Sequence, residues 1–402
     1  MSTSDSPGTP DPPGPVGPES DPGAAGGSDP GAAGGSDPGV RVRPTLVGEF
    51  KDAVTLRAVL LVIGVAVIQL AFITSYVGAF HRPVPYRLPV AVVAPPDESA
   101  RLVAALNGIK GTPLQATAVT SLAAGTDQLL RRSVYGVLEV SPAASGASGV
   151  RLIEASASGV SASQALTEVL DAVGVSLHEK VSVDDIRPPS AGDRNSLTSF
   201  YLVIGWIVGG YLVASILGIS DGSRPANPQR ATVRLGVIAV YALATGFLGS
   251  MVVGPLLHAL PGHSVQLTLL GALLVFSAGA FSMALQVVAG TIGIGITILV
   301  FVVLGNPRAG GAYSWQLLPA FWRTIGPWIP SGAGTAAARG IAYFGGVAIA
   351  TNLVVIAGYG LLGIIVIYVV LVDVGHQLIA LPEAARSEVD EAALVAPADR
   401  HS

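Results

Sequence analysis

The long apolar segments of this chain offer few side chains for chemistry, and those few are uncharged amides. Gln69, Gln286 and Asn352 each lie in a stretch that contains no Asp, Glu, Lys or Arg. An amide in such surroundings is costly unless it bonds to another helix, to water or to a substrate. Bonding between helices is the simpler interpretation, and contact with a transported substrate is the alternative. The lack of ionisable groups in these stretches argues against proton-coupled pumping.

Other side chains that could do chemistry form no recognised site. His258 and His263 flank a Pro-Gly turn, but no acidic residue accompanies them, so we assign no metal. Ser75, Ser199 and Ser314 lack a recognisable base or nucleophile-elbow motif. The chain has no G-x-x-x-x-G-K-[ST] loop for nucleotide phosphates. The sequence therefore predicts no enzyme and no ATPase site, and it indicates no cofactor.

Long stretches without charge determine the expected architecture. They cover Ala58–Phe80, Leu197–Ile219, Leu235–Leu257, Val265–Gly305 and Ile341–Val372. About twenty helical residues cross a hydrocarbon core of about 30 Å, so the stretch from Val265 is long enough to cross twice. Half of all residues are apolar, which leaves few charges to solvate a large surface. We expect an α-helical polytopic membrane protein with six transmembrane helices.

Charge and cysteine content exclude several partners. The net charge is −4, the acidic residues gather in the tails, and there is no long basic run. Nucleic acid is therefore excluded as a partner, whereas the lipid bilayer is expected. The chain contains no cysteine, which excludes disulfides, thiol catalysis and thiolate metal sites.

The distribution of basic residues predicts the orientation. Four precede the first span and two follow it: Arg41, Arg43, Lys51 and Arg57, then Arg82 and Arg87. The positive-inside rule then places the N-terminus in the cytoplasm of a cell whose plasma membrane the chain crosses several times. The same alternation leaves Arg308, Arg323 and Arg339 outside, against the rule.

The segment from residue 83 to 195 has the pattern of a small extracytoplasmic α/β domain between the first and second spans. Strands are expected at Leu88–Ala94, Leu114–Val119, Ser133–Val140 and Val150–Glu154. Helices are expected at Glu98–Leu106, Leu122–Arg132 and Ser161–Lys180. About one hundred residues suffice for a modest core.

The remaining segments complete the expected organisation. Residues 1–44 are rich in Pro, Gly and Ser and repeat an octad from Ser20 and Ser28, which predicts a disordered cytoplasmic tail. A solvated linker is favoured over a docking tail, because the tract has no aromatic anchor. Residues 45–82 would form an interfacial helix and the first span, residues 196–304 spans two to five, residues 341–373 the sixth span, and residues 374–402 a cytoplasmic tail.

Residues 305–340 are too polar for an ordinary span and too apolar for a free loop. Their prolines and tryptophans include Pro307, Trp315, Pro319, Trp322, Trp328 and Pro330. Tryptophan prefers the membrane interface, and irregular backbone at membrane depth is tolerated where protein or water satisfies it. We expect a re-entrant or interfacial hairpin, acting either as a connector or as a gate.

The order of these parts, together with short Gly/Pro motifs, carries a resemblance. The motifs are Leu88-Pro-Val-Ala-Val-Val93, Gly305-Asn-Pro-Arg-Ala-Gly-Gly311, Leu318-Pro-Ala-Phe, Ile329-Pro-Ser-Gly and Arg339-Gly-Ile-Ala-Tyr-Phe-Gly-Gly346. Over about Thr45–Val372 the chain resembles the YhgE/Pip-like membrane proteins, which belong to the superfamily of type-2 ABC export permeases. It lacks the long coiled-coil insert of some members, so functions that depend on that insert are not carried over.

The resemblance implies an ABC-type permease subunit that exports a hydrophobic or amphipathic substrate across the bacterial plasma membrane. The energy would come from a separate ABC ATPase subunit or from an undetermined source, and we expect the permease to be a homodimer. The loop Asp221–Arg234 would then contact the ATPase through Arg224, Arg230 and Arg234, and a purely topogenic role for these arginines is the alternative. A non-transporting receptor or envelope-assembly scaffold with an external α/β domain is the second hypothesis.

Overall fold

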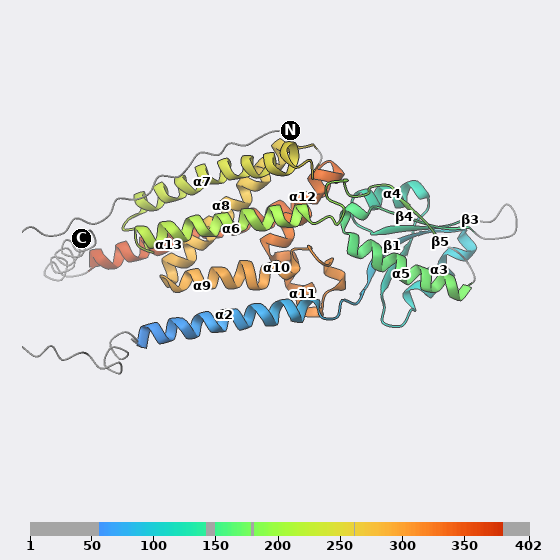
Figure 1. Cartoon of the computed structure of the whole chain (residues 1–402), viewed down its shortest axis with the longest axis horizontal. Coiled ribbons are helices and arrows are strands. Elements are labelled where there is room, and N and C mark those ends of the chain that lie inside the picture. Colours follow the sequence, from blue (N-terminus) through green and yellow to red (C-terminus); the bar gives the residue numbers. More distant parts are fainter. Residues whose placement is uncertain (1–55, 142–148, 178–180, 261, 381–402) are drawn as a thin grey trace, which may run out of the picture. The chain divides into compact units, whose positions relative to one another are not determined.

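The computed structural model describes residues 56–141, 149–177, 181–260 and 262–380 (Figure 1). Residues 59–402 belong to one compact unit, and of the unit formed by residues 1–58 only the start of the first helix is described. The expected disordered tail, most of the expected interfacial helix and the end of the second tail lie outside the described residues.

Five strands form one sheet in the order β2-β1-β3-β4-β5. They are β1 (Leu88–Val93), β2 (Leu114–Ala118), β3 (Gly136–Ser141), β4 (Gly149–Glu154) and β5 (Val181–Asp185). Strand β1 pairs in parallel with β2 and β3, β3 pairs antiparallel with β4, and β4 pairs in parallel with β5. The small α/β region expected from the sequence is therefore present. It contains one strand, β5, that the sequence analysis did not predict.

Helices cover both faces of this sheet. They are α3 (Pro96–Asn107), α4 (Leu122–Leu130) and α5 (Val160–Leu177), with a 3₁₀ turn, η1 (Ser156–Ser158), before α5. Leu106 of α3 and Leu166 of α5 are buried against one face, whereas Leu129 of α4 is buried against the other. Phe344, which lies far along the chain, completes the second face. The domain core is thus shared with the membrane region.

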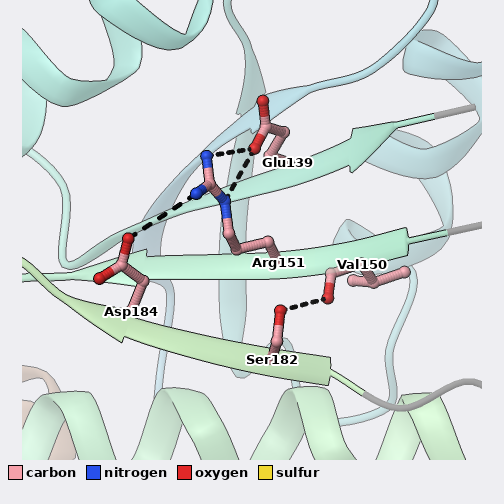
Figure 2. A network of polar contacts seen from close by, with 5 residues as sticks. All are labelled: Glu139, Val150, Arg151, Ser182 and Asp184. Atoms are coloured by element: carbon pink, nitrogen blue, oxygen red, sulfur yellow. Dashed lines mark hydrogen bonds and ion pairs between the residues drawn. The ribbon is translucent and has the colours of Figure 1, made fainter.

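An exposed polar network crosses three strands of the sheet (Figure 2). Arg151 of β4 pairs with Glu139 of β3 at 2.8 Å and with Asp184 of β5 at 3.8 Å. On β5, the Ser182 hydroxyl donates to the Val150 carbonyl at 3.3 Å. Exposed pairs of this kind contribute less than about 1 kcal/mol each, so the network fixes the strand register more than it stabilises the fold.

Among the described residues, five helices are long and apolar enough to cross a membrane. They are Val59–Phe80 in α2 (Leu56–Phe80), α6 (Thr198–Ser220), Pro228–Leu256 in α7 (Pro228–Met251) and its continuation η2 (Val252–Leu256), α8 (Ser264–Ala289), and Ala350–Asp373 in α13 (Ala350–Ala380). Of these windows, that of α8 is the most buried and that of α2 the most exposed. The chain is therefore a mostly helical protein of multi-pass character, with α8 at the centre of the bundle.

The stretch from Val265, expected to cross twice, is interrupted. After α8 the chain turns at Gly290, whose φ of 62° favours glycine. The apolar helix that follows, Ile292–Arg308, is shorter than the five spans. It consists of α9 (Ile292–Ile298), the π-helical η3 (Leu299–Leu304) and α10 (Gly305–Arg308).

The expected start of the last span at Ile341 is wrong. Ile341 belongs to a separate buried helix, α12 (Pro330–Phe344). Gly345 and Gly346, with φ of 62° and 79°, end α12 in the left-handed conformation that suits glycine. The last span therefore begins at Ala350, since hydropathy alone does not register the break.

Contacts at the helix ends define two sides of the bundle. At one end, the Ser190 hydroxyl donates to Ala259 after η2, and Arg339 of α12 donates to Ser196 before α6. The α/β domain lies at this same end, because Arg132 donates to the Val347 carbonyl before α13. At the other end, Arg224 after α6 donates to the Val287 carbonyl near the end of α8.

Candidate functional site

A cavity of about 460 Å³ lies where the α/β domain meets α12 and the start of α13. Four parts of the chain line it: the turn between α4 and β3, η1, residues of the segment 308–327, and the facing sides of α12 and α13. The polar lining residues include Arg131, Arg132, Tyr135, Ser158, Arg308, Ser314, Thr335, Arg339, Thr351 and Asn352. The cavity is therefore built jointly by the α/β domain and the helical region.

Arg132 reaches the cavity from the turn that follows α4. Its backbone φ of 57° is unusual for a residue with a side chain. The guanidinium donates to the Ala336 carbonyl of α12 and to the Ala348 carbonyl at 3.2 Å. Gly340 permits this approach, because a Cβ there would lie 2.7 Å from the Nη2 atom of Arg132. Burial lowers the pKa of Arg132, and the nearby Arg339 lowers it further.

Arg308, the last residue of α10, enters the cavity from the other side. The side chain is 6% exposed and donates to the Trp322 carbonyl at 2.6 Å and the Arg323 carbonyl at 3.0 Å. Its guanidinium lies 5.2 Å from the centre of the Trp315 ring, within the range of a cation–π contact. A Cβ at Gly326 would overlap this guanidinium, so glycine at that position makes room for the charge.

Arg339 of α12 is the third arginine of the cavity, and it is buried, whereas Arg132 is half-buried. It is 6% exposed, and its Nη2 donates to the Ser196 carbonyl at 2.7 Å and the Gly310 carbonyl at 2.8 Å. The charge of Asp193 acts on Arg339. However, the Asp193 carboxylate accepts hydrogen bonds from Tyr343 at 2.9 Å and from the Thr198 amide at 2.8 Å.

No carboxylate within ion-pair distance balances these three arginines in the part of the chain that the structure describes. The ion pairs there join Arg131 to Asp127 and Arg151 to its two strand partners. None of the described lining residues is Asp or Glu. The Nε atoms of Arg132 and Arg339 are buried and lack a hydrogen-bond partner. The cavity thus concentrates positive charge that backbone carbonyls hold in place without neutralising it.

Of the three amides expected to make intramembrane polar contacts, Asn352 alone lines this cavity. Gln286 is 1% exposed and donates from Nε2 to the Ser282 hydroxyl at 3.3 Å, while its Oε1 has no partner. The same hydroxyl lies 3.2 Å from that of Thr297 in α9, so this network joins two helices. Gln69 is exposed on α2.

The three arginines expected to contact an ATPase differ in whether their side chains are already bonded within the chain. Arg224 donates to the carbonyls of Val287 and Val288 at 2.7 and 3.0 Å. Arg234 is 8% exposed and donates to two carbonyls of its own loop at 2.8 Å. Arg230 is exposed, and its backbone amide donates to the Asn227 side chain that caps α7.

Residues 305–340 fold into short pieces and pack partly on the α/β domain. They contain η4 (Trp315–Leu317), α11 (Ala320–Ile325) and η5 (Gly326–Trp328) besides α10 and the start of α12. The Val84 and Tyr86 amides donate to the carbonyls of Leu317 and Gln316, both at 3.1 Å, and the Leu317 side chain joins the domain core. Half of the expected hairpin is therefore a supporting segment for the domain.

The prolines and tryptophans of this segment occupy different environments. Trp322 is 6% exposed and packs with Ala79 of α2 and Leu318, whereas Trp315 and Trp328 are 43% and 71% exposed. Buried prolines are Pro307 and Pro330, and Pro319 is half-buried. The exposed tryptophans lie close to the cavity, because Trp315 and the neighbour of Trp328, Pro327, line it.

Sequence reasoning missed Arg132, Arg308 and Arg339 as site residues. A signal for two of them existed, because Arg308 and Arg339 are basic residues on the side where the positive-inside rule disfavours them. Both also lie in the Gly-rich motifs, in which Gly310 approaches Arg339 and Gly340 approaches Arg132. No such signal existed for Arg132, because in the sequence it lies at the end of the ordinary helix expected at Leu122–Arg132.

Comparison of the chain with protein-family models, with curated proteins and with solved structures finds no match. The class of the protein therefore follows from its own architecture, which is a helical multi-pass bundle joined to a small α/β domain. What the cavity does follows from its chemistry.

Proposed function

We propose that the chain is a permease subunit that exports an amphipathic substrate, whose polar part lies in the cavity between the α/β domain and the helical bundle. The observation that carries this proposal is the cavity lining. Membrane helix α13 contributes Thr351 and Asn352, and the α/β domain contributes Arg132 and Ser158. A site shared in this way gives a substrate contact with both regions, as transport from membrane to exterior requires.

The proposed topology has six crossings, with Ile292–Arg308 as the short fifth one. This assignment agrees with the helix ends, because Gly290 lies close to Ser223 at one end and Gly310 contacts Arg339 at the other. Val59 of α2 and the end of α13 at Ala380 then lie on the side opposite the α/β domain. We assign that side to the cytoplasm, the domain to the exterior and the chain to the plasma membrane.

A separate ABC ATPase is the proposed energy source, and two copies of this chain would form the permease. Contact with the ATPase would involve residues 221–234, which form the connection after α6 and the first turns of α7, with Arg230 as an exposed charge near the start of α7. Arg224 and Arg234 stabilise the loop through carbonyl contacts, which holds Arg230 at the edge of the bundle. Resemblance to the type-2 export permeases supports this arrangement.

Purification from native membranes in mild detergent tests the proposal. Capture of the full chain should recover a nucleotide-binding protein at constant ratio, with ATPase activity in the eluate, and the Arg230→Gln variant should lose both. Arg101→Gln is the matched control, because Arg101 is an exposed arginine of α3 in the α/β domain. Absence of any nucleotide-binding protein, or equal recovery with Arg230→Gln, would contradict the proposal.

The second candidate is a non-transporting receptor or envelope-assembly scaffold. The observation that favours it is the packing of Gln286, which is closed off in the bundle centre with its network to Ser282 and Thr297. A scaffold needs no substrate movement, so its activity should persist without ATP hydrolysis. Capture of envelope proteins without an ATPase would favour this candidate.

A further inference from the structure

We propose that the cavity binds a phosphate-bearing anionic group, so that the exported substrate is an anionic amphiphile. This inference rests on the proposed function and names the substrate class of the same site. It is carried by the convergence of Arg132, Arg308 and Arg339 on one cavity whose described lining contains no acidic side chain.

The first argument is charge balance. Burying a cation without a counter-ion is costly, and carbonyl contacts repay only part of that cost. Arg308 and Arg339 are each 6% exposed, and no described carboxylate lies within ion-pair distance of them. A bound anion would supply the missing counter-charge for Arg308 and Arg132, and it would add to the charge of Asp193 that already acts on Arg339.

The second argument is preorganisation. Carbonyl groups from the segment 310–348 and from Ser196 hold the three guanidiniums, so little side-chain freedom is lost when an anion binds. The Nε atoms of Arg132 and Arg339 are buried without a partner, so the carbonyls do not satisfy these two guanidiniums completely. A guanidinium binds phosphate through paired N–H donors, which a lysine does not reproduce.

The third argument concerns the hydrophobic part of the ligand. A volume of about 460 Å³ holds a headgroup but not two long acyl chains. Exposed apolar side chains adjoin the cavity: Trp315, itself a lining residue, is 43% exposed, and Trp328, next to the lining residue Pro327, is 71% exposed. A lipid could thus leave its chains in the bilayer while its phosphate enters the cavity.

The test uses the full chain in lipid nanodiscs. Discs of phosphatidylcholine are compared with discs that also contain phosphatidylglycerol, and the lipid retained by each chain is measured by native mass spectrometry. Inorganic phosphate and glycerol 1-phosphate serve as soluble competitors. Variants Arg132→Gln, Arg308→Gln and Arg339→Gln are compared with Arg323→Gln, which removes a carbonyl-bonded arginine that does not line the cavity.

Wild-type protein should retain phosphatidylglycerol over phosphatidylcholine. Each cavity variant should weaken this retention by about tenfold to a hundredfold, the usual effect of losing a charge-assisted hydrogen bond, and Arg323→Gln should leave it unchanged. Competition by soluble phosphate would show that a phosphate group alone is sufficient for binding. If soluble phosphate does not compete, the cavity binds the phosphate group only as part of a lipid. Equal retention of both lipids together with no effect of soluble phosphate would overturn the inference.

A variant that fails to fold does not remove the test. Arg132→Lys keeps the charge in the less buried of the three positions and should still lose most of the selectivity, because lysine lacks the paired donors. The competition experiment needs no variant at all. If the cavity binds the anion but no ATPase is captured, the permease proposal fails and only anion binding by the cavity stands. If an ATPase is captured but no anion binds, this inference fails and the permease proposal stands.

Discussion

Glu154 gives the α/β domain a pH dependence whose size can be worked from the structure. This residue ends β4 opposite Asp185 of β5, is 8% exposed, and has an Oε2 atom without a hydrogen-bond partner. Burial, followed by the charge of Asp185, raises the pKa of Glu154 from 4.5 to about 7. Asp185 itself accepts hydrogen bonds from the Ser156 hydroxyl and from the amides of Ser156 and Arg187. The neutral form is therefore favoured at Glu154.

The sign follows from proton linkage. Because the folded pKa of Glu154 lies above the unfolded value, its contribution to stability is complete below about pH 4.5 and is lost as pH rises through about 7. At 1.36 kcal/mol per pH unit, a rise from 4.5 to about 7 corresponds to at most about 3 kcal/mol. Glu154→Gln removes the charge while keeping the shape, so it should stabilise the domain at pH 8 and not at pH 4.

Hydrogen exchange of β4 and β5 in the detergent-solubilised full chain measures this effect. The opening free energy, corrected for intrinsic exchange, should fall by up to about 3 kcal/mol from pH 5 to pH 8 in wild type and stay nearly constant in Glu154→Gln. Asp184→Asn is the control, because Asp184 is an exposed carboxylate of the neighbouring strand β5. Identical pH profiles for wild type and Glu154→Gln would refute the reasoning.

Two further substitutions test the surroundings of the cavity. Gly326→Ala should displace the guanidinium of Arg308 and destabilise the chain by about 1–3 kcal/mol, while Gly236→Ala, with nothing near its Cβ, should not; thermal unfolding measures both. Trp322→Ala should cost about 3–5 kcal/mol, because Trp322 is 6% exposed. Trp328→Ala, at a side chain that is 71% exposed, should change unfolding by about 0.5 kcal/mol or less, and equal effects of the two tryptophan variants would contradict the packing described.

Much of the fold could be predicted from sequence because its signals are local. Charge-free stretches marked the long spans, and alternating or helical apolar patterns marked four of the strands and three helices of the α/β domain. Strand β5 was not predicted, because apolar and polar residues alternate only weakly in Val181–Asp185, which lies at an exposed edge of the sheet. The helix break at Gly345 was not predicted, because hydropathy does not report the left-handed backbone conformation that glycine adopts readily.

The candidate site could be predicted only in part, because its residues come from distant segments. Asn352 was identified from its polar character in an apolar stretch, and it does line the cavity. Arg132 and Arg339 are more than two hundred residues apart in sequence, and they meet only because the α/β domain packs on α12. No local pattern contains that contact. The predicted topology placed Arg308 and Arg339 on the side where the positive-inside rule disfavours basic residues, without explaining why. The structure explains their position, because both side chains are buried and donate hydrogen bonds to backbone carbonyls.

The most direct test of the central claim is the reactivity of a single cysteine in the cavity. The chain has no cysteine of its own, so Thr351→Cys, at an exposed position of the cavity lining, introduces one thiol. Its rates with a sulfonate-bearing and a trimethylammonium-bearing methanethiosulfonate are compared with those of Ala105→Cys on α3. The account predicts that the anionic reagent gains at least about tenfold at Thr351→Cys relative to Ala105→Cys and loses this gain when Arg132→Gln is added. Equal rate ratios at the two positions would contradict a cationic, ligand-accessible cavity.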